Sequence, residues 1–189
     1  MFDSRDYAVL EVLARAQSDY VPAAVVAEAA HPVVEKIAEP IERLIRLGVP
    51  VESHPVYGFR LPVSFDLIDR HIVSEKLKAK GIDWPVHGRL ETGSTNDLAN
   101  SAAAEGAPDG TTFFAEHQTQ GRGRLGRAWH SPVGSGLWFS VLRRHDLPIE
   151  EGWRVTLGAG LAVAEAVAGL TDLDPKLKWP NDVLIEGRK

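Results

Sequence analysis

The segment at residues 118–129 (QTQGRGRLGRAW) constrains the fold most, because it places three glycines and three arginines in one polar run. It lies between two runs of aromatic and β-branched residues, 111–116 and 137–142, which are typical of strands. We therefore expect a long loop between two paired strands. Glycine lets a backbone approach a ligand closely, and guanidinium groups bind phosphate or carboxylate oxygens. The segment predicts a loop that closes over an anion.

Three side chains of this loop, Arg122, Arg124 and Arg127, supply the positive charge, and Trp129 offers a ring on which a base could stack. The loop is not a Walker P-loop, because no Gly-Lys-Ser/Thr follows and no helix is expected at its end. Taken alone, the segment fits equally well a flexible basic surface loop or an arginine cluster that binds RNA. The rest of the chain has to decide between these interpretations.

Composition excludes several classes of function. The 189 residues contain no cysteine, so disulfides, a thiolate nucleophile and a cysteine-ligated zinc site are ruled out. The net charge of −5 argues against a protein that coats nucleic acid. No signal-peptide pattern begins the chain, and we expect no apolar run of the roughly 18 residues that a membrane span needs. A cytoplasmic protein without a membrane segment is the expectation.

Hydrophobic spacing predicts an α+β protein in two parts, joined near residues 61–69. In the first part, apolar periodicity predicts three helices followed by a small β-hairpin, which is the winged helix-turn-helix pattern. We place this domain at residues 1–65 and a second, mixed-sheet domain at residues 66–189. The first part is expected to have helices at 7–16, 21–30 and 33–47 and strands at 49–51 and 58–61.

The second part alternates helices and strands. Ser94, Thr95 and Asn96 stand between a predicted strand and an Ala-rich helix that ends at Gly106. Such residues are ordinary N-caps when considered alone. A buried helix is expected at 153–170, and the remaining elements are helix 67–80, strand 86–91 and a hairpin of strands 177–179 and 183–186 around Pro180, Asn181 and Asp182.

Four motifs in this order resemble the biotin–protein ligases. They are Gly-Ser-Thr-Asn-Asp at 93–97, the loop at 118–129, Lys-Trp-Pro-Asn-Asp at 178–182 and Gly-Arg-Lys at 187–189. The N-terminal part resembles that of the bifunctional bacterial ligases, which also repress biotin synthesis. The resemblance implies a catalytic domain of the biotin/lipoyl ligase type.

The resemblance also implies a role for each matching residue. Arg124 and Lys189 would be catalytic. Biotin would be bound by Ser94, Thr95, Asn96, Gln118, Arg122, Gly123, Arg124 and Lys189. The nucleotide would be bound by Arg122, Arg124, Arg127, Trp129, Lys178 and Asn181, and Asp182 would lie near a metal ion.

The implied reaction joins biotin and ATP, with Mg²⁺, to form biotinoyl-5′-AMP and pyrophosphate. The biotinoyl group is then transferred to a lysine of the biotin carboxyl carrier protein of acetyl-CoA carboxylase. A homodimer and operator DNA are further implied partners. Three alternatives remain: a lipoyl or octanoyl ligase, a regulator that senses biotinoyl-AMP without turnover, and an RNA-binding module.

Two departures from the family pattern stand out. The chain ends at Lys189, whereas the family's catalytic domains continue, so the resemblance implies a domain that is incomplete at its C-terminus. Residues 1–65 carry nine acidic and six basic side chains, and Glu35 and Glu39 lie in the expected recognition helix. Acidic groups there would repel DNA phosphates, and Pro40 should kink that helix or begin a new one.

Overall fold

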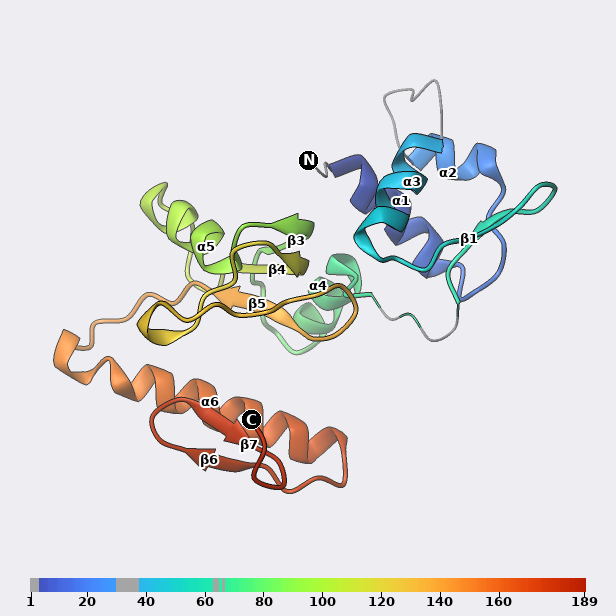
Figure 1. Ribbon diagram of the computed structural model, residues 1–189. Coiled ribbons are helices and arrows are strands. Elements are labelled where there is room, and N and C mark those ends of the chain that lie inside the picture. The colour runs from blue at the N-terminus through green and yellow to red at the C-terminus, as the bar shows by residue number, and fades with distance from the viewer. Residues whose placement is uncertain (1–3, 30–37, 63–64, 66) are drawn as a thin grey trace. The chain divides into compact units, whose positions relative to one another are not determined.

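The computed structural model describes residues 4–29, 38–62, 65 and 67–189. The chain divides into two compact units, Met1–Arg144 and His145–Lys189. Both helices and strands are present in each unit (Figure 1), so the expected α+β class is confirmed.

The first unit begins with three helices and a hairpin, in the order that the sequence predicts. The helices are α1 (Ser4–Arg15), α2 (Ala23–Ala29) and α3 (Ala38–Leu47). The antiparallel strands β1 (Glu52–His54) and β2 (Gly58–Arg60) follow. The first strand thus lies beyond the expected 49–51, because Val49 instead turns back to hydrogen-bond Leu44 at the end of α3.

Proline at position 40 fits the start of a helix. Because its missing N–H falls in the first turn of α3, it costs no intrahelical hydrogen bond there. Because residues 30–37 lie outside the described residues, whether Pro40 kinks the expected helix or begins a new one stays a prediction. Residues 30–37, which include Glu35 and the first five residues of the helix expected at 33–47, lie outside the described residues.

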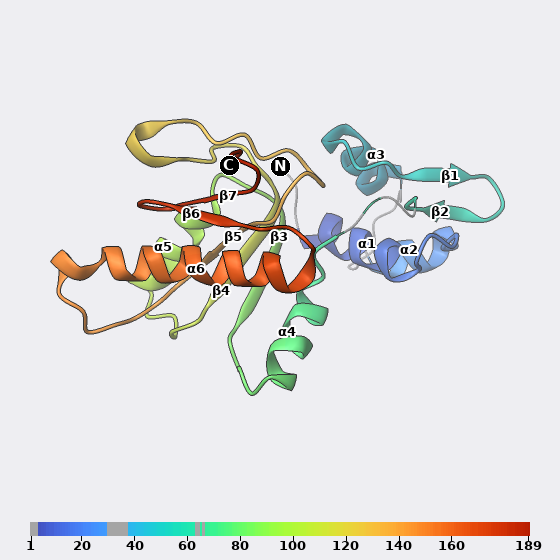
Figure 2. The same ribbon diagram turned by 90° about the horizontal axis from the view of Figure 1, so that it is seen from below.

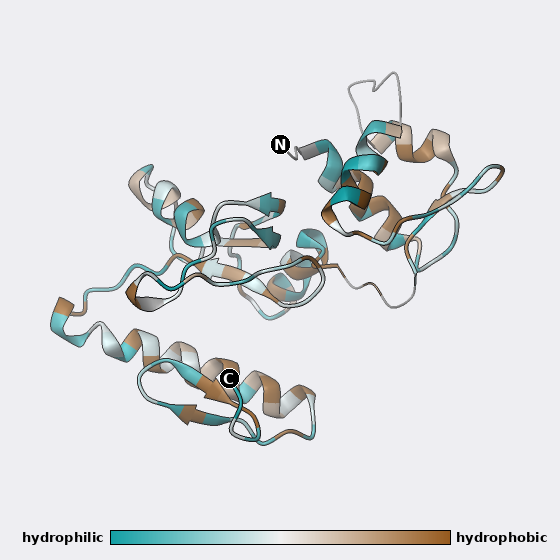
Figure 3. Ribbon diagram, in the orientation of Figure 1, coloured by the Kyte–Doolittle hydropathy of each residue, from teal (hydrophilic) through white to brown (hydrophobic). Residues whose placement is uncertain are grey.

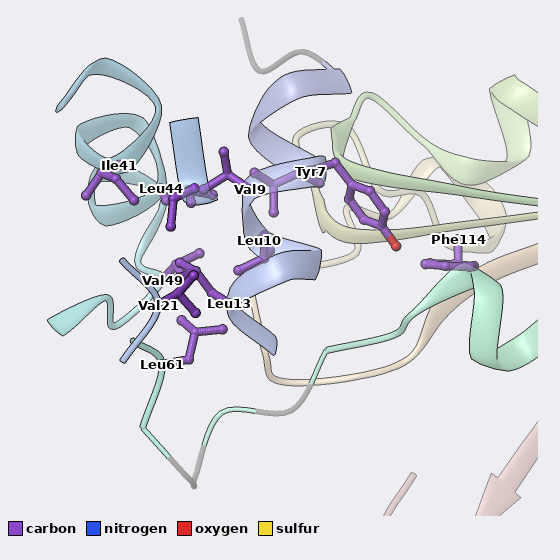
Figure 4. Packing of buried hydrophobic residues seen from close by; sticks show 12 residues of the cluster. Tyr7, Val9, Leu10, Leu13, Val21, Ile41, Leu44, Val49, Leu61 and Phe114 are labelled. Carbon is purple, nitrogen blue, oxygen red and sulfur yellow. The ribbon is translucent and has the colours of Figure 1, made fainter. Parts of the chain in front are cut away.

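The core of the first unit joins the N-terminal helices to the sheet. Tyr7, on α1, is 4% exposed, and its hydroxyl donates a hydrogen bond to the Ile68 carbonyl at 2.8 Å. Figure 4 shows its ring extending from α1 toward Phe114 of the sheet. The division of the chain into domains at residues 1–65 and 66–189 stays a prediction. The other buried apolar residues of this cluster include Val9, Leu10, Leu13, Val26, Ile41, Leu44, Val49 and Leu61.

Helix α4 (Arg70–Ala79) leads into a three-stranded sheet with the order β3-β4-β5. Strand β3 (Val86–Thr92) is parallel to β4 (Thr112–Gln118), and β4 is antiparallel to β5 (Trp138–Val141). The sheet is therefore mixed, as expected. Helix α5 (Thr95–Ala104) connects the two parallel strands, so its first turn lies at the edge where β3 and β4 end.

The second unit contains the short helix η2 (Ile149–Glu151), helix α6 (Trp153–Leu170) and the hairpin of β6 (Lys176–Lys178) and β7 (Asp182–Leu184). The hairpin packs along α6 (Figure 2). The ends of α6 match the sequence prediction.

Helix α6 is not buried within its own unit. Among its residues only Ala164 is buried, because within its unit the helix contacts only the small hairpin and η2. Its apolar residues, which colour parts of the α6 ribbon brown in Figure 3, are therefore largely exposed within this unit. By length and composition, residues 149–170 also form a helix that could cross a membrane, which the sequence analysis did not expect. Core helices of soluble proteins meet the same criterion.

Candidate functional site

The first turn of α5 presents three polar residues at the edge of the sheet. Ser94 is the N-cap: its backbone is extended, and its hydroxyl accepts a hydrogen bond from the Asn96 N–H at 3.3 Å. Ser94 is 2% and Thr95 is 4% exposed, whereas Asn96 faces solvent. The Asp97 and Leu98 N–H groups both donate to the Ser94 carbonyl, so the donors that this turn offers to a ligand are those of its side chains.

Gln118 ends β4 directly beside this turn. Its Oε1 atom accepts a hydrogen bond from the Thr95 N–H at 2.8 Å. The Thr95 hydroxyl has one proton, which it can donate either to this Oε1 atom at 3.2 Å or to the Ser140 hydroxyl at 2.9 Å. Its Nε2 atom donates to the Ser131 hydroxyl at 3.0 Å. The structure thus brings together Thr95 and Gln118, which stand 23 residues apart in the sequence.

The loop that follows Gln118 is a folded hairpin. Trp129 N donates to the Gly121 carbonyl, and Gly123 N donates to the Arg127 carbonyl, both at 2.8 Å. A further antiparallel bridge joins Gln118 to Ser131. A Cβ atom on Gly121 would lie only 2.5 Å from the Trp129 carbonyl oxygen, so only glycine allows this close pairing. The expected loop between paired strands is confirmed, and its own backbone holds its shape.

The arginines of the loop differ in their surroundings. Arg122 forms an ion pair with Asp97 in the first turn of α5. The hydrogen bond to Asp97, and then its negative charge, raise the pKa of the Arg122 guanidinium. Arg127 is exposed, whereas the side chain of Arg124 lies outside what the structure describes. Trp129 is 39% exposed near the base of the hairpin, where a Cβ on Gly123 would meet its ring at 3.7 Å.

In the second unit, Lys189 and Asp182 form an ion pair. Their Nζ and Oδ1 atoms are 2.6 Å apart. A tight turn brings Lys189 back, with two backbone hydrogen bonds between Ile185 and Arg188. The turn residues Glu186 and Gly187 both have positive φ, as a two-residue hairpin turn of this kind requires.

The other motif residues of this unit surround a pocket between α6 and the hairpin. Its volume is about 240 Å³. Lys178 ends β6, and Asn181 and Asp182 follow the cis Trp179–Pro180 bond. The lining residues are Leu157, Gly160, Leu177, Lys178, Trp179, Pro180, Asn181 and Asp182.

The described residues could hold a magnesium ion only with one carboxylate and the phosphates of a substrate. Among the residues that the structure describes, no group of three or more His, Asp or Glu side chains could enclose a metal ion. Mg²⁺ commonly uses one or two carboxylates together with substrate phosphates. The single carboxylate of Asp182 is compatible with that arrangement, but one of its oxygens already contacts Lys189.

Sequence reasoning missed three residues that contact the predicted site. These are Asp97, which pairs with Arg122, and the serines Ser131 and Ser140. Ser140 is a polar residue inside the apolar strand β5, and that interruption was the available signal. No sequence signal pointed to Ser131, because its contact with Gln118 depends on the hairpin that folds between the two residues.

Comparison with known proteins places this geometry in a family. Residues 90–189, which include every predicted site residue, match the biotin/lipoate A/B protein ligase family. The chain belongs to this family. The resemblance to biotin–protein ligases that the four motifs carry is thereby confirmed.

Two relatives illustrate how far the similarity extends. The bifunctional ligase/repressor BirA of Bacillus spizizenii is 30% identical over 181 residues, which cover 96% of this chain and 56% of that protein. The biotin–[acetyl-CoA-carboxylase] ligase of Mycobacterium tuberculosis is 42% identical over 129 residues, or 65% of this chain and 48% of that protein. The chain thus spans about half the length of these family members.

Among solved structures, the biotin protein ligase of Leishmania major in complex with biotinyl-5-AMP is 30% identical. The match covers 55% of this chain and 48% of that chain, with a TM-score of 0.48.

Proposed function

We propose that this chain activates biotin with MgATP as biotinoyl-5′-AMP. One observation carries the proposal: in a member of this family, the start of α5, the Gln118 amide and an arginine-bearing hairpin meet at one edge of the sheet. The Ser94 hydroxyl and the Asn96 side-chain amide at the α5 turn suit the polar ring atoms of biotin. The guanidinium groups beside them suit the biotin carboxylate and the α-phosphate.

In the proposed reaction, a biotin carboxylate oxygen attacks the α-phosphorus of ATP, and pyrophosphate leaves. Negative charge builds on the phosphoryl oxygens, and Arg122 and Arg124 would offset it. Lys189 would add a compact positive charge beside the reacting atoms. Mg²⁺, held by Asp182 and the phosphates, would neutralise the leaving pyrophosphate. The chain itself forms no covalent bond, so its contribution is positioning and charge.

Further roles follow from the same proposal. Trp129, Arg127, Lys178 and Asn181 would contact the nucleotide, and Ser94, Asn96 and Gly123 would contact biotin. In the second step, the amine of a carrier-protein lysine attacks the acyl carbon of the adenylate, and AMP leaves. The partner would be the biotin carboxyl carrier protein of acetyl-CoA carboxylase, in the cytoplasm, and the ligase would act as a homodimer.

The family also includes lipoate ligases, which is the main alternative. Of the two relatives described above, the one from Mycobacterium tuberculosis is named as a biotin–[acetyl-CoA-carboxylase] ligase. Its name supports biotin as the acid that is activated. Replacing biotin with lipoate in the same assay separates the two functions.

The N-terminal part is proposed to be a winged helix, because three helices precede a hairpin there. Its arginines are poorly placed for operator DNA. Arg43 pairs with the buried Asp6 at 2.7 Å, and Arg60 pairs with Glu52 at 2.7 Å. Cations that are already paired gain less from DNA phosphates. A gel shift at moderate salt tests the regulator alternative, which requires a complex that tightens when biotinoyl-AMP is added.

The proposed activity is tested by incubating the purified chain with biotin and MgATP and detecting biotinoyl-5′-AMP by mass spectrometry. Reactions without biotin, and with lipoate instead, are the controls. Formation of the adenylate with biotin alone is the expected result. A folded chain that binds biotin but forms no adenylate would contradict the proposed catalytic activity of these 189 residues.

A further inference from the structure

Two serines outside the family motifs contact the polar residues of the site. Ser140 lies on β5 and Ser131 at the base of the loop hairpin. The Ser140 hydroxyl donates to Asn96 Oδ1 at 2.6 Å, across 44 residues of sequence. The Ser131 hydroxyl, which is 2% exposed, accepts from Gln118 Nε2 at 3.0 Å. Each serine thus touches the side-chain amide of one proposed biotin-binding residue.

The direction of the hydrogen bonds near Ser140 follows from counting protons. A serine hydroxyl has one proton to donate, and Asn96 Oδ1 can only accept. Ser140 therefore gives its proton to Asn96. The 2.9 Å contact between Ser140 and Thr95 must then be a donation from Thr95 Oγ1, whose single proton is therefore not available to Gln118 Oε1 at 3.2 Å. Donation runs in one direction, from Thr95 through Ser140 to Asn96.

This chain of donation fixes the Asn96 amide. Ser140 holds the Oδ1 end of the Asn96 amide, and no described residue hydrogen-bonds to the Nδ2 group. Asn96 is exposed, and an exposed asparagine ordinarily samples several rotamers in water. Ser140 therefore holds a solvent-facing donor in one orientation.

Gln118 is fixed at both ends in a comparable way. Its Oε1 atom accepts the Thr95 N–H at 2.8 Å, and its Nε2 atom donates to Ser131. The Ser131 hydroxyl donates its own hydrogen bond to the Trp129 carbonyl at 3.4 Å, so its lone pairs can accept the hydrogen bond from Gln118. The amide of Gln118 is thereby oriented before any ligand arrives.

We propose that Ser131 and Ser140 are positioning residues for biotin, which orient the Gln118 and Asn96 amides. The inference rests on the proposed function for the identity of the ligand. Preorganised donors cost less entropy on binding than donors that must be ordered by the ligand. Loss of either hydroxyl should therefore weaken biotin binding without removing a group that touches biotin.

The first test needs no ligand. In the full chain, Ser140→Ala should shift and narrow the dispersion of the Asn96 side-chain amide signals in an NMR spectrum and leave those of Gln118 in place. Ser131→Ala should do the reverse. Ser135→Ala is the matched control, because the Ser135 hydroxyl donates only to the Pro132 carbonyl of its own turn at 2.8 Å. Unchanged Asn96 signals in Ser140→Ala would overturn the inference for Ser140.

The second test measures the dissociation constant of biotin by calorimetry. Ser140→Ala loses the hydrogen bond to Asn96, and Ser131→Ala loses the hydrogen bond from Gln118. Each loss should raise the dissociation constant of biotin about threefold to tenfold. Ser140→Thr keeps the hydroxyl and should restore wild-type binding and the wild-type Asn96 signals. Altered amide signals with unaltered biotin binding would overturn the positioning role. Failure of the wild-type chain to bind biotin would instead overturn the proposed function, while the amide signals would still decide how Ser131 and Ser140 act.

Discussion

Lys189 Nζ lies 2.6 Å from Asp182 Oδ1, although seven positions separate the two residues in the sequence. The turn at Glu186 and Gly187 produces this contact by reversing the chain after β7. Lys189 is half exposed and Asp182 is less so, with side-chain exposures of 50% and 23%. The carboxylate therefore acts as the fixed partner that orients a long, flexible ammonium side chain.

We predict that Asp182→Asn slows adenylate formation about tenfold to a hundredfold, because Lys189 loses the charge that orients it and Mg²⁺ loses its proposed carboxylate. The KM for biotin should change less, since this substitution leaves the proposed biotin-contacting residues of α5 intact. Single-turnover kinetics measures the rate. Asp174→Asn is the control, because Asp174 pairs with the exposed Lys176 at 2.8 Å in the same unit. Equal rates for wild type and Asp182→Asn would contradict the role of the pair.

The ion pair between Arg122 and Asp97 leads to a second prediction. Asp97 competes with any anionic ligand for the Arg122 guanidinium. Asp97→Asn removes that competing charge and adds one net positive charge to the site. The dissociation constant of biotinoyl-AMP should fall about twofold to fivefold, which is the scale of an exposed ion pair.

Salt dependence separates this effect from a change in structure. The gain from Asp97→Asn should shrink as ionic strength rises, because salt screens exposed charges. Asp109→Asn is the matched control: Asp109 pairs with Arg143 at 3.1 Å, and neither is among the predicted site residues. Weaker adenylate binding in Asp97→Asn would show instead that Asp97 is needed to hold Arg122 in place.

Local sequence patterns predicted most of the fold. The bounds of α6 and the order of the strands followed from apolar periodicity and from glycine and proline positions. The burial of α6 could not be predicted in this way, because periodicity reports how apolar a helix is and not what covers it. Strand β1 was misplaced because Val49 and Val51 are apolar, yet the hydrogen bonds of Val49 belong to the end of α3.

The candidate site was predictable only where residues are close in sequence. The turn at 93–97 and the loop at 118–129 could be recognised from their local amino-acid sequence. The contacts of Ser140 with Asn96 and of Ser131 with Gln118 depend on the pairing register of β4 with β5 and on the loop hairpin. A one-residue shift of register would turn Ser140 to the other face, so no local pattern identifies these partners.

A third prediction concerns the pH dependence of stability at Asp69, the N-cap of α4. Burial acts to raise the pKa of Asp69, but the His71 N–H, the Arg15 guanidinium and the Ile72 N–H together lower it. A lowered pKa means that the carboxylate stabilises the fold above its ordinary pKa of about 4 and that this contribution is lost as the pH falls. Asp69→Asn should therefore reduce the free energy of unfolding by about 1 kcal/mol at pH 7 and by less below pH 4 or so. Urea unfolding at several pH values measures this difference.

Glu11 should show the opposite pH dependence. Burial raises the pKa of Glu11, and the Arg70 cation at 3.4 Å only partly offsets this. With a raised pKa, the folded chain binds more protons than the unfolded chain, so stability falls as the pH rises from about 4. Glu11→Gln removes this pH dependence. The free energy of unfolding of the variant, relative to that of the wild type, should therefore increase as the pH rises. A parallel pH dependence for Glu11→Gln and Asp69→Asn would contradict the assigned pKa directions.

The last prediction concerns the packing between α1 and the sheet. A Cβ atom at Gly88 would lie 2.5 Å from Tyr7 Oη and 2.9 Å from Phe114 Cζ, and both rings are almost fully buried. Gly88→Ala should force Tyr7 away from the Ile68 carbonyl and lower the free energy of unfolding by about 1–3 kcal/mol. Gly169→Ala is the control, because a Cβ there meets no atom within 4 Å. In helix α6 that change should be neutral or stabilise by up to about 1 kcal/mol. If both variants were equally stable in urea, the close contact of Gly88 with Tyr7 would not limit the packing of α1.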